Sequence, residues 1–228
     1  MLALWAWRQC KRAGVSPRAL LGPPPLESDW RLLVVVLPLL PIALGAIWLI
    51  WLPISYAMPD FVQQWILKED PAMWIRDAPL RSVLAILTIV IVAPIVEEFV
   101  FRGVLLQRFA AKWGPVTAVF VSAVLFGLLH ADVLGKTVFG IVMAMLYVRT
   151  RGLWLPIACH MLNNAFGVAL SFIPWASTQR PYTLADFRGD WHVGAISLVV
   201  GVAMFYALRD RIIPPPGWRL PVPQDPSG

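Results

Sequence analysis

The chain has 228 residues, of which 59% are apolar and only 14% are charged, and its mean hydropathy is +0.70. Soluble domains carry about a quarter charged residues, so this chain lacks the polar groups that would cover a water-exposed surface. The composition excludes a soluble domain and predicts an integral membrane protein in contact with the lipid bilayer. The net charge of +6 does not indicate nucleic-acid binding, because the basic residues sit in short flanks between apolar runs.

Six apolar runs along the chain predict helices that cross the membrane. About 20 residues of helix are needed to span a hydrocarbon core about 30 Å thick, and several runs approach that length. In chain order they are Leu32–Ile54, Val83–Phe109, Pro115–His130, Lys136–Val148, Leu153–Ile173 and Val193–Leu208. The third, fourth and sixth runs are short, so tilt, bilayer thinning or burial inside the bundle must accommodate them. The predicted fold class is all-α, a polytopic bundle of about six transmembrane helices.

The distribution of basic residues predicts how this bundle is oriented. If the runs alternate across the membrane, thirteen of the 19 lysines and arginines fall on the side that holds both termini. Basic flanks favour the cytoplasmic side, so both termini are expected to be cytoplasmic. The other side holds Lys68, Arg76, Arg81, Lys136, Arg180 and Arg188. The predicted organisation is an interfacial N-terminal segment over 1–31, a transmembrane bundle over 32–208 and a proline-rich cytoplasmic tail over 209–228, expected to be extended chain.

The second run carries three ionisable residues in the string VEEFVFRG. A charged residue at the centre of a membrane helix costs about 2.5 to 3.5 kcal/mol on insertion scales, so such residues usually face a cavity or pair. Glu98 and Arg102 are four residues apart, share a helix face and are expected to pair. Glu97 lies about 100° around the helix from Glu98 and has no such partner. It is therefore either available as a base or paired with a basic residue on another helix.

Two later runs each place a histidine on one helix face with a second residue. The string FGLLH puts Phe126 and His130 four residues apart, and HMLNN does the same for His160 and Asn164. Either pair alone is as well explained by hydrogen bonds that lock helices together. The combination with Glu97 favours catalysis, because these groups can move protons and stabilise an oxyanion. At about 1.5 Å per residue, His130 lies deeper in the membrane than the other three unless its helix tilts.

The motifs EExxxR, FxxxH and HxxxN, in this order on successive membrane helices, resemble the CPBP family. This is the CAAX-protease and bacteriocin-processing (Abi) group of intramembrane proteases, often described as metalloproteases. The resemblance covers roughly Ser82–Pro174, which would form a CAAX-protease-like catalytic core. It implies an endopeptidase acting on a membrane-associated peptide or protein. The compact chain is expected in a bacterial inner (plasma) membrane, with a peptide leader or a membrane-protein tail as its substrate.

The resemblance implies roles for seven residues. Glu97 would activate the attacking water and His130 would help to hold it, whereas His160 and Asn164 would stabilise the oxyanion. The remaining three would brace the site: Glu98, Arg102 and Phe126, the last by packing beside His130. Asn163 leaves open which of two neighbouring amides points inward, and the spacing from His160 favours Asn164.

A metal-dependent mechanism is the alternative to water activation by a glutamate alone. Glu97, His130 and His160 could ligate Zn²⁺, since catalytic zinc sites use three protein ligands and a water. The sequence has no HExxH string, and the two histidines come from different helices. We therefore expect no bound metal or other cofactor, with zinc as the alternative.

Two readings without proteolysis compete with this prediction. A membrane scaffold or a bacteriocin self-immunity protein would keep the bundle and the ion pair but would not need Glu97 or His130. A small transporter could use Glu97 as a proton carrier, but it would be expected to have inverted repeats or matched broken helices. The sequence contains no such repeat.

Overall fold

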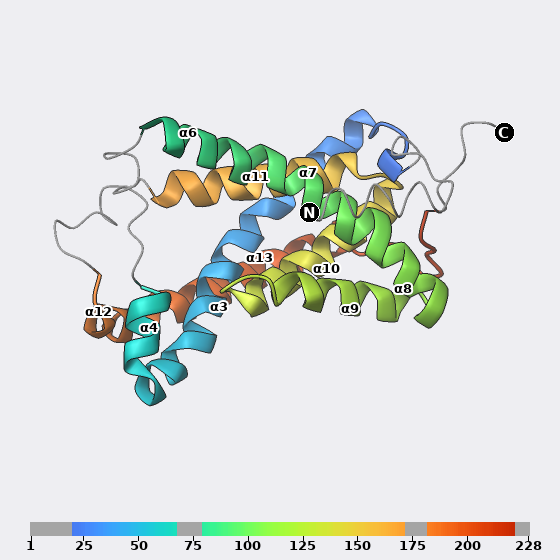
Figure 1. The fold of residues 1–228 in the computed structure, drawn as a ribbon. Coiled ribbons are helices and arrows are strands. Elements are labelled where there is room, and N and C mark those ends of the chain that lie inside the picture. The colour runs from blue at the N-terminus through green and yellow to red at the C-terminus, as the bar shows by residue number, and fades with distance from the viewer. Residues whose placement is uncertain (1–19, 68–78, 172–181, 222–228) are drawn as a thin grey trace.

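A computed structural model describes residues 20–67, 79–171 and 182–221, and within these ranges it contains helices and no strand (Figure 1). In chain order the elements are η1 Glu27–Val35, α3 Val36–Ala57, α4 Pro59–Trp65, α6 Pro79–Leu87, η2 Thr88–Val92, α7 Ala93–Glu98, η3 Phe99–Leu105, α8 Leu106–Trp113, α9 Pro115–Gly127, α10 Val133–Thr150, α11 Trp154–Ser171, α12 Leu184–Gly189 and α13 Trp191–Ile212. The predicted fold class, an all-α membrane bundle, is confirmed.

The six predicted runs correspond to helices, but only some of these are long and apolar enough to cross a membrane. In the described part of the chain there are four such helices: Glu27–Ala57, Leu80–Trp113, Val133–Thr150 and Trp191–Ile212. The third run forms α9, which has 13 residues. The fifth run forms α11, whose histidine and two asparagines lower its hydropathy. The first helix also begins earlier than expected, at Glu27, where the Asp29 side chain accepts from the Leu26 N–H at 2.9 Å.

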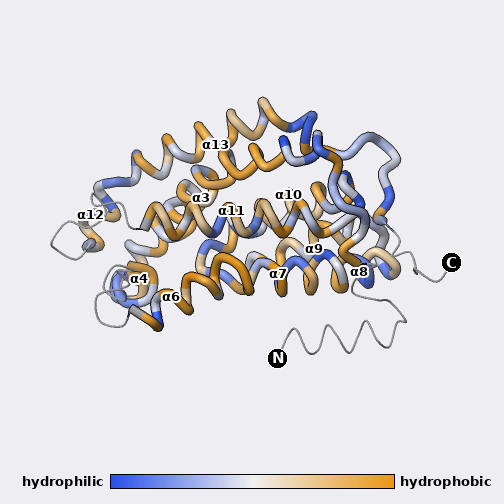
Figure 2. Tube along the Cα trace, turned by 90° about the horizontal axis from the view of Figure 1, so that it is seen from above, coloured by the Kyte–Doolittle hydropathy of each residue, from blue (hydrophilic) through white to orange (hydrophobic). Residues whose placement is uncertain are grey.

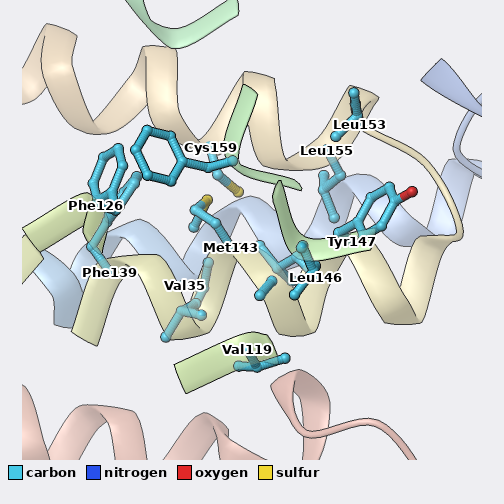
Figure 3. Close-up of a cluster of buried hydrophobic side chains, with 14 of the residues drawn as sticks. Val35, Val119, Phe126, Phe139, Met143, Leu146, Tyr147, Leu153, Leu155 and Cys159 are labelled. Carbon is cyan, nitrogen blue, oxygen red and sulfur yellow. The ribbon is translucent and has the colours of Figure 1, made fainter. Parts of the chain in front are cut away.

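Helix α10 lies at the centre of the bundle and packs against α3, α9, α11 and α13. Figure 2 shows that the helices around it are predominantly hydrophobic, and many of their outward-facing apolar side chains are exposed, as expected in lipid. The buried core follows α10: Phe126 and Phe139 lie at one end of it, Tyr147 at the other, and Met143 and Leu146 between them (Figure 3).

Glycines allow α3 and α13 to pack closely, which is typical of membrane helix pairs. A Cβ atom on Gly201 would lie 2.8 Å from the backbone nitrogen of Ile42 and 3.0 Å from the carbonyl oxygen of Pro38. The two backbones therefore approach at a distance that only glycine permits.

Replacing Gly201 with Ala is expected to destabilise the bundle by about 1 to 3 kcal/mol, because the added methyl group forces the two helices apart. Thermal unfolding in detergent measures this loss. Gly167→Ala is the matched control, since a Cβ atom there meets nothing within 4 Å. Equal unfolding temperatures for the two variants would contradict the close packing of α3 against α13.

The segment from α6 to α8 is one continuous helix that contains two wide turns of π type, η2 and η3. Pro94 lacks an N–H group and crowds the carbonyl one turn earlier, and the first wide turn, η2, ends just before it. The second wide turn, η3, begins directly after Glu98. Wide turns of this type are frequent at functional sites, and here they flank the two glutamates.

The tail predicted from residue 209 begins later in the part that the structure describes. Helix α13 continues to Ile212 and ends before Pro214, because a residue that precedes proline avoids helical geometry. The chain then lies along the bundle: Gln107 Nε2 donates to the carbonyl oxygen of Pro221 at 2.9 Å, and Trp218 packs against the core. Proline lacks the backbone N–H donor but keeps its carbonyl oxygen as an acceptor. A proline-rich segment can therefore still bind to the surface of the bundle. Residues 222–228 lie outside the described ranges.

Candidate active site

Glu98 joins two helices through one carboxylate oxygen. Its Oε1 accepts a hydrogen bond from Nη1 of Arg102 at 2.9 Å and another from Nδ1 of His160 at 2.8 Å. Arg102 also donates from Nη2 to the carbonyl oxygen of Gly140 at 3.1 Å, which adds α10 to the assembly. All three side chains are buried. The i, i+4 spacing predicted the first bond; the tie to His160 crosses between α7 and α11 and was not predicted.

Glu97 differs from its neighbour in both burial and bonding. Its side chain is 28% exposed, whereas that of Glu98 is 0% exposed. Its Oε2 lies 3.6 Å from Nε2 of His160, on the edge of the ring opposite the Glu98 bond. Among the described residues, no lysine or arginine forms an ion pair with Glu97. The alternative of a basic partner on another helix is therefore not found there, and Glu97 remains accessible.

Phe126, on α9, is the centre of an aromatic cluster that supports the polar groups. Its ring centroid lies 4.7 Å from that of His130 and 5.8 Å from that of His160, and the Arg102 guanidinium carbon lies 4.9 Å from it. The side chain is fully buried, with its ring edge toward Phe101 at 5.1 Å. Phe126 thus packs beside both histidines and the arginine, and its bracing role stays a prediction.

His130 lies in the turn after α9 and not within the helix, which ends at Gly127. Its Nδ1 is 2.9 Å from the carbonyl oxygen of Phe126. A carbonyl can only accept, so Nδ1 carries the proton, and in the neutral ring Nε2 is left as an acceptor. The greater depth estimated from a straight helix does not separate His130 from the site, because the turn and the ring contact with Phe126 bring it into the same cluster.

Asn164 is one turn away from His160 on α11, but its amide is already engaged. Its Nδ2 donates to the carbonyl oxygen of Ile89 at 2.9 Å. Ile89 lies in η2, so a side chain of α11 bonds the carbonyl of a wide turn. One of the two amide hydrogens of Asn164 is thus committed and one remains. Asn163 is more deeply buried than Asn164. Burial therefore does not favour Asn164 as the inward-pointing amide, as the spacing from His160 did.

The described residues do not gather as a metal centre in this structure. No group of three His, Cys, Asp or Glu side chains among the described residues is close enough together to hold a metal ion. The zinc alternative named Glu97, His130 and His160 as ligands. Each histidine uses Nδ1 for a hydrogen bond, which is also how metal-binding histidines are held, and Nε2 of His160 faces Glu97. The choice between water activation by Glu97 alone and zinc therefore stays a prediction, and no step below uses a metal.

The sequence analysis missed Phe139 and Lys136 on α10. The Phe139 ring centroid lies 4.7 Å from that of His160, and the Lys136 ammonium lies 5.4 Å from the Phe139 ring. Lys136 was read only as a charge in the flank of an apolar run. Its spacing of three residues from Phe139, inside that run, is the one signal that links it to the aromatic cluster.

The fold and site together define a helical integral membrane protein with a cluster of carboxylate, imidazole and amide groups inside its bundle. Comparison with known families gives a match over residues 79–166 to the Rce1-like family, described as "Type II CAAX prenyl endopeptidase Rce1-like". This segment contains the two glutamates and both histidines. The resemblance to the CPBP family that the three motifs indicated is thereby confirmed over this segment.

Two curated bacterial proteins are similar to part of the chain. "Putative membrane peptidase YdiL" of Bacillus subtilis (strain 168) is 37% identical over 94 residues, which are 40% of this chain and 38% of that protein. "Membrane-embedded CAAX protease MroQ" of Staphylococcus aureus (strain USA300) is 32% identical over 106 residues, 42% of this chain and 43% of that protein. The chain thus matches about two fifths of the length of these relatives. No solved structure matches it.

Proposed function

We propose that the chain is an intramembrane endopeptidase that hydrolyses a peptide bond near the membrane, in a tail or leader of a membrane-associated protein or peptide. The observation that carries this proposal is the contrast between two adjacent carboxylates. Glu98 is fully buried and bonded to Arg102 and His160, so it has a structural part. Glu97 is partly exposed, without a short hydrogen bond, and adjacent to the same histidine. The names of the two curated relatives, a membrane peptidase and a membrane-embedded protease, support the same class of activity.

In the proposed reaction Glu97 removes a proton from a water molecule as that water attacks the scissile carbonyl. His130 helps to orient the water: with Nδ1 bonded to the Phe126 carbonyl, its Nε2 is the nitrogen that can accept a hydrogen bond. The proton then goes from Glu97 to the nitrogen of the leaving peptide. The oxygen of the water ends in the new carboxyl group, and the proton that Glu97 removed ends on the new amine.

The oxyanion is stabilised by donors on α11. Asn164 has one amide hydrogen beyond the bond to Ile89. His160 donates from Nδ1 to Glu98, so it can donate to an oxyanion only when Nε2 carries a second proton. Fixed donors of this kind contribute about 10²- to 10³-fold in rate each.

Cleavage is expected to survive a metal chelator, because the described residues gather no metal-binding triad. The test uses purified protein in lipid nanodiscs with a set of membrane-anchored peptides, and mass spectrometry of the products with and without the chelator. Cleavage at the same rate supports a mechanism based on Glu97. Loss of cleavage with recovery on adding Zn²⁺ would keep the endopeptidase and overturn the mechanism. Absence of cleavage with every peptide would favour the scaffold or self-immunity alternative.

A further inference from the structure

Lys136 is a charged residue next to the site that the proposed mechanism does not use. It lies in the first turn of α10, is half-buried, and holds its ammonium 5.4 Å from the Phe139 ring centroid. The Phe139 ring packs against that of His160 at 4.7 Å, and His160 faces Glu97. The ammonium is close enough for electrostatic interaction with Asp132 and, more weakly, with Glu97. It therefore belongs to the surroundings of the reacting groups.

The Lys136 ammonium has no contacting counter-ion among the described residues, although Asp132 and Glu97 act on it from farther away. No carboxylate of these residues lies within ion-pair distance of it. Asp132 is one turn earlier, but its Oδ1 accepts from the Gly135 N–H, and its buried Oδ2 has no hydrogen-bond partner in the described structure. Burial raises the pKa of the Asp132 carboxyl group. Arg102, the other cation near Glu97, has an ion pair, a carbonyl acceptor and an aromatic face.

A partly buried ammonium without a contacting counter-ion is costly, and an incoming anion that contacts it would offset that cost. The carboxylate of Glu97 would repel any anion that binds nearby. Such an anion therefore needs a neighbouring cation to bind. We propose that Lys136 binds a carboxylate group of the substrate peptide and thereby selects substrates that carry one close to the scissile bond. This inference rests on the proposed endopeptidase function. Two sources share this chemistry, the C-terminal carboxylate of the peptide and the side chain of an Asp or Glu.

The test measures binding separately from cleavage. Three fluorescent, acyl-anchored peptides share one apolar sequence: the first ends in a free carboxylate, the second in an amide, and the third in an amide but with a Glu near its end. Dissociation constants are measured in nanodiscs with Glu97→Gln protein, which retains a bound peptide intact. Lys136→Met, added to this background, removes the charge and keeps an apolar side chain against Phe139. Lys136→Arg, added in the same way, keeps the charge. Cleavage of the same peptides is followed with Lys136 variants that retain Glu97.

Protein with Lys136 is expected to bind at least one carboxylate peptide about tenfold more tightly than the plain amide, because a charge-assisted hydrogen bond is worth about one decade in affinity or more. The Met variant should lose this preference, the Arg variant should keep it, and the affinity for the plain amide should stay the same. Whichever carboxylate peptide is preferred identifies the source of the anion.

Equal affinities for all three peptides in protein with Lys136 would overturn the inference, and this comparison does not depend on any Lys136 variant folding. A loss of affinity of the same size for all peptides in Lys136→Met would overturn it as well, since Lys136 would then act on the site as a whole. Cleavage without carboxylate preference would leave the endopeptidase standing and remove the subsite. Carboxylate-dependent binding without any cleavage would leave the subsite standing and contradict the endopeptidase function.

Discussion

Replacing Glu97 with Gln is expected to reduce the cleavage rate constant by about 10²- to 10⁴-fold, the range that general-base catalysis contributes. Gln has the shape of Glu but cannot take a proton from water. The stability of the fold should stay nearly unchanged, because Glu97 is partly exposed and its nearest ionic contact, with His160, is 3.6 Å long. Product formation by mass spectrometry gives the rate, and thermal unfolding in detergent gives the stability.

The matched control for this variant is Glu27→Gln, which makes the same chemical change on an exposed glutamate at the start of the first helix. It should cleave at the wild-type rate. If Glu97→Gln and Glu27→Gln were equally active, Glu97 would not be the base.

Glu98→Ala should have the largest effect on stability, about 3 to 5 kcal/mol, because removing one partner of a buried ion pair leaves the other charge uncompensated. Arg102 would keep a full charge inside the bundle, and Nδ1 of His160 would lose its acceptor. Denaturant or thermal unfolding in detergent measures the loss. Activity should fall with it, since the histidine that faces Glu97 would no longer be held.

A second ion pair in the same chain provides the control. Arg209 and Asp210 lie 3.6 Å apart with both side chains substantially exposed. Asp210→Ala should therefore change stability by less than about 1 kcal/mol, as is usual for exposed pairs. The double variant Glu98→Gln with Arg102→Met, which removes both buried charges, should recover much of the stability lost in Glu98→Ala. Equal unfolding temperatures for Glu98→Ala and Asp210→Ala would contradict the structural part assigned to Glu98.

Contacts within one helix could be predicted from the sequence, because side chains four residues apart meet on one face. The pair of Glu98 with Arg102 follows from that rule, and the contact of Phe126 with His130 forms although His130 lies in the turn after the helix. The same spacing suggested that His160 and Asn164 act together. In the structure the first bonds Glu98 and the second bonds Ile89, because their partners are on another helix.

Contacts between helices depend on packing and on local departures from regular helix geometry. Asn164 bonds a carbonyl of the wide turn η2. A wide turn does not change the spacing of apolar residues in a way that the sequence shows. Lys136 was missed for a related reason: a lysine at the end of an apolar run is indistinguishable in sequence from a flank charge. For the fold, hydropathy located the helices, whereas capping by Asp29 and the docking of the chain up to Pro221 changed the expected boundaries.

The most direct test of the account is cleavage of a membrane-anchored peptide in water enriched in oxygen-18, with purified wild-type protein and Glu97→Gln compared in the same nanodisc preparation. Wild-type protein is expected to release a fragment whose new C-terminal carboxylate carries one oxygen-18 atom, and Glu97→Gln is expected to form this fragment at least about 100-fold more slowly. Formation of the labelled fragment at equal rates by both proteins, or by neither across the peptide set, would contradict it.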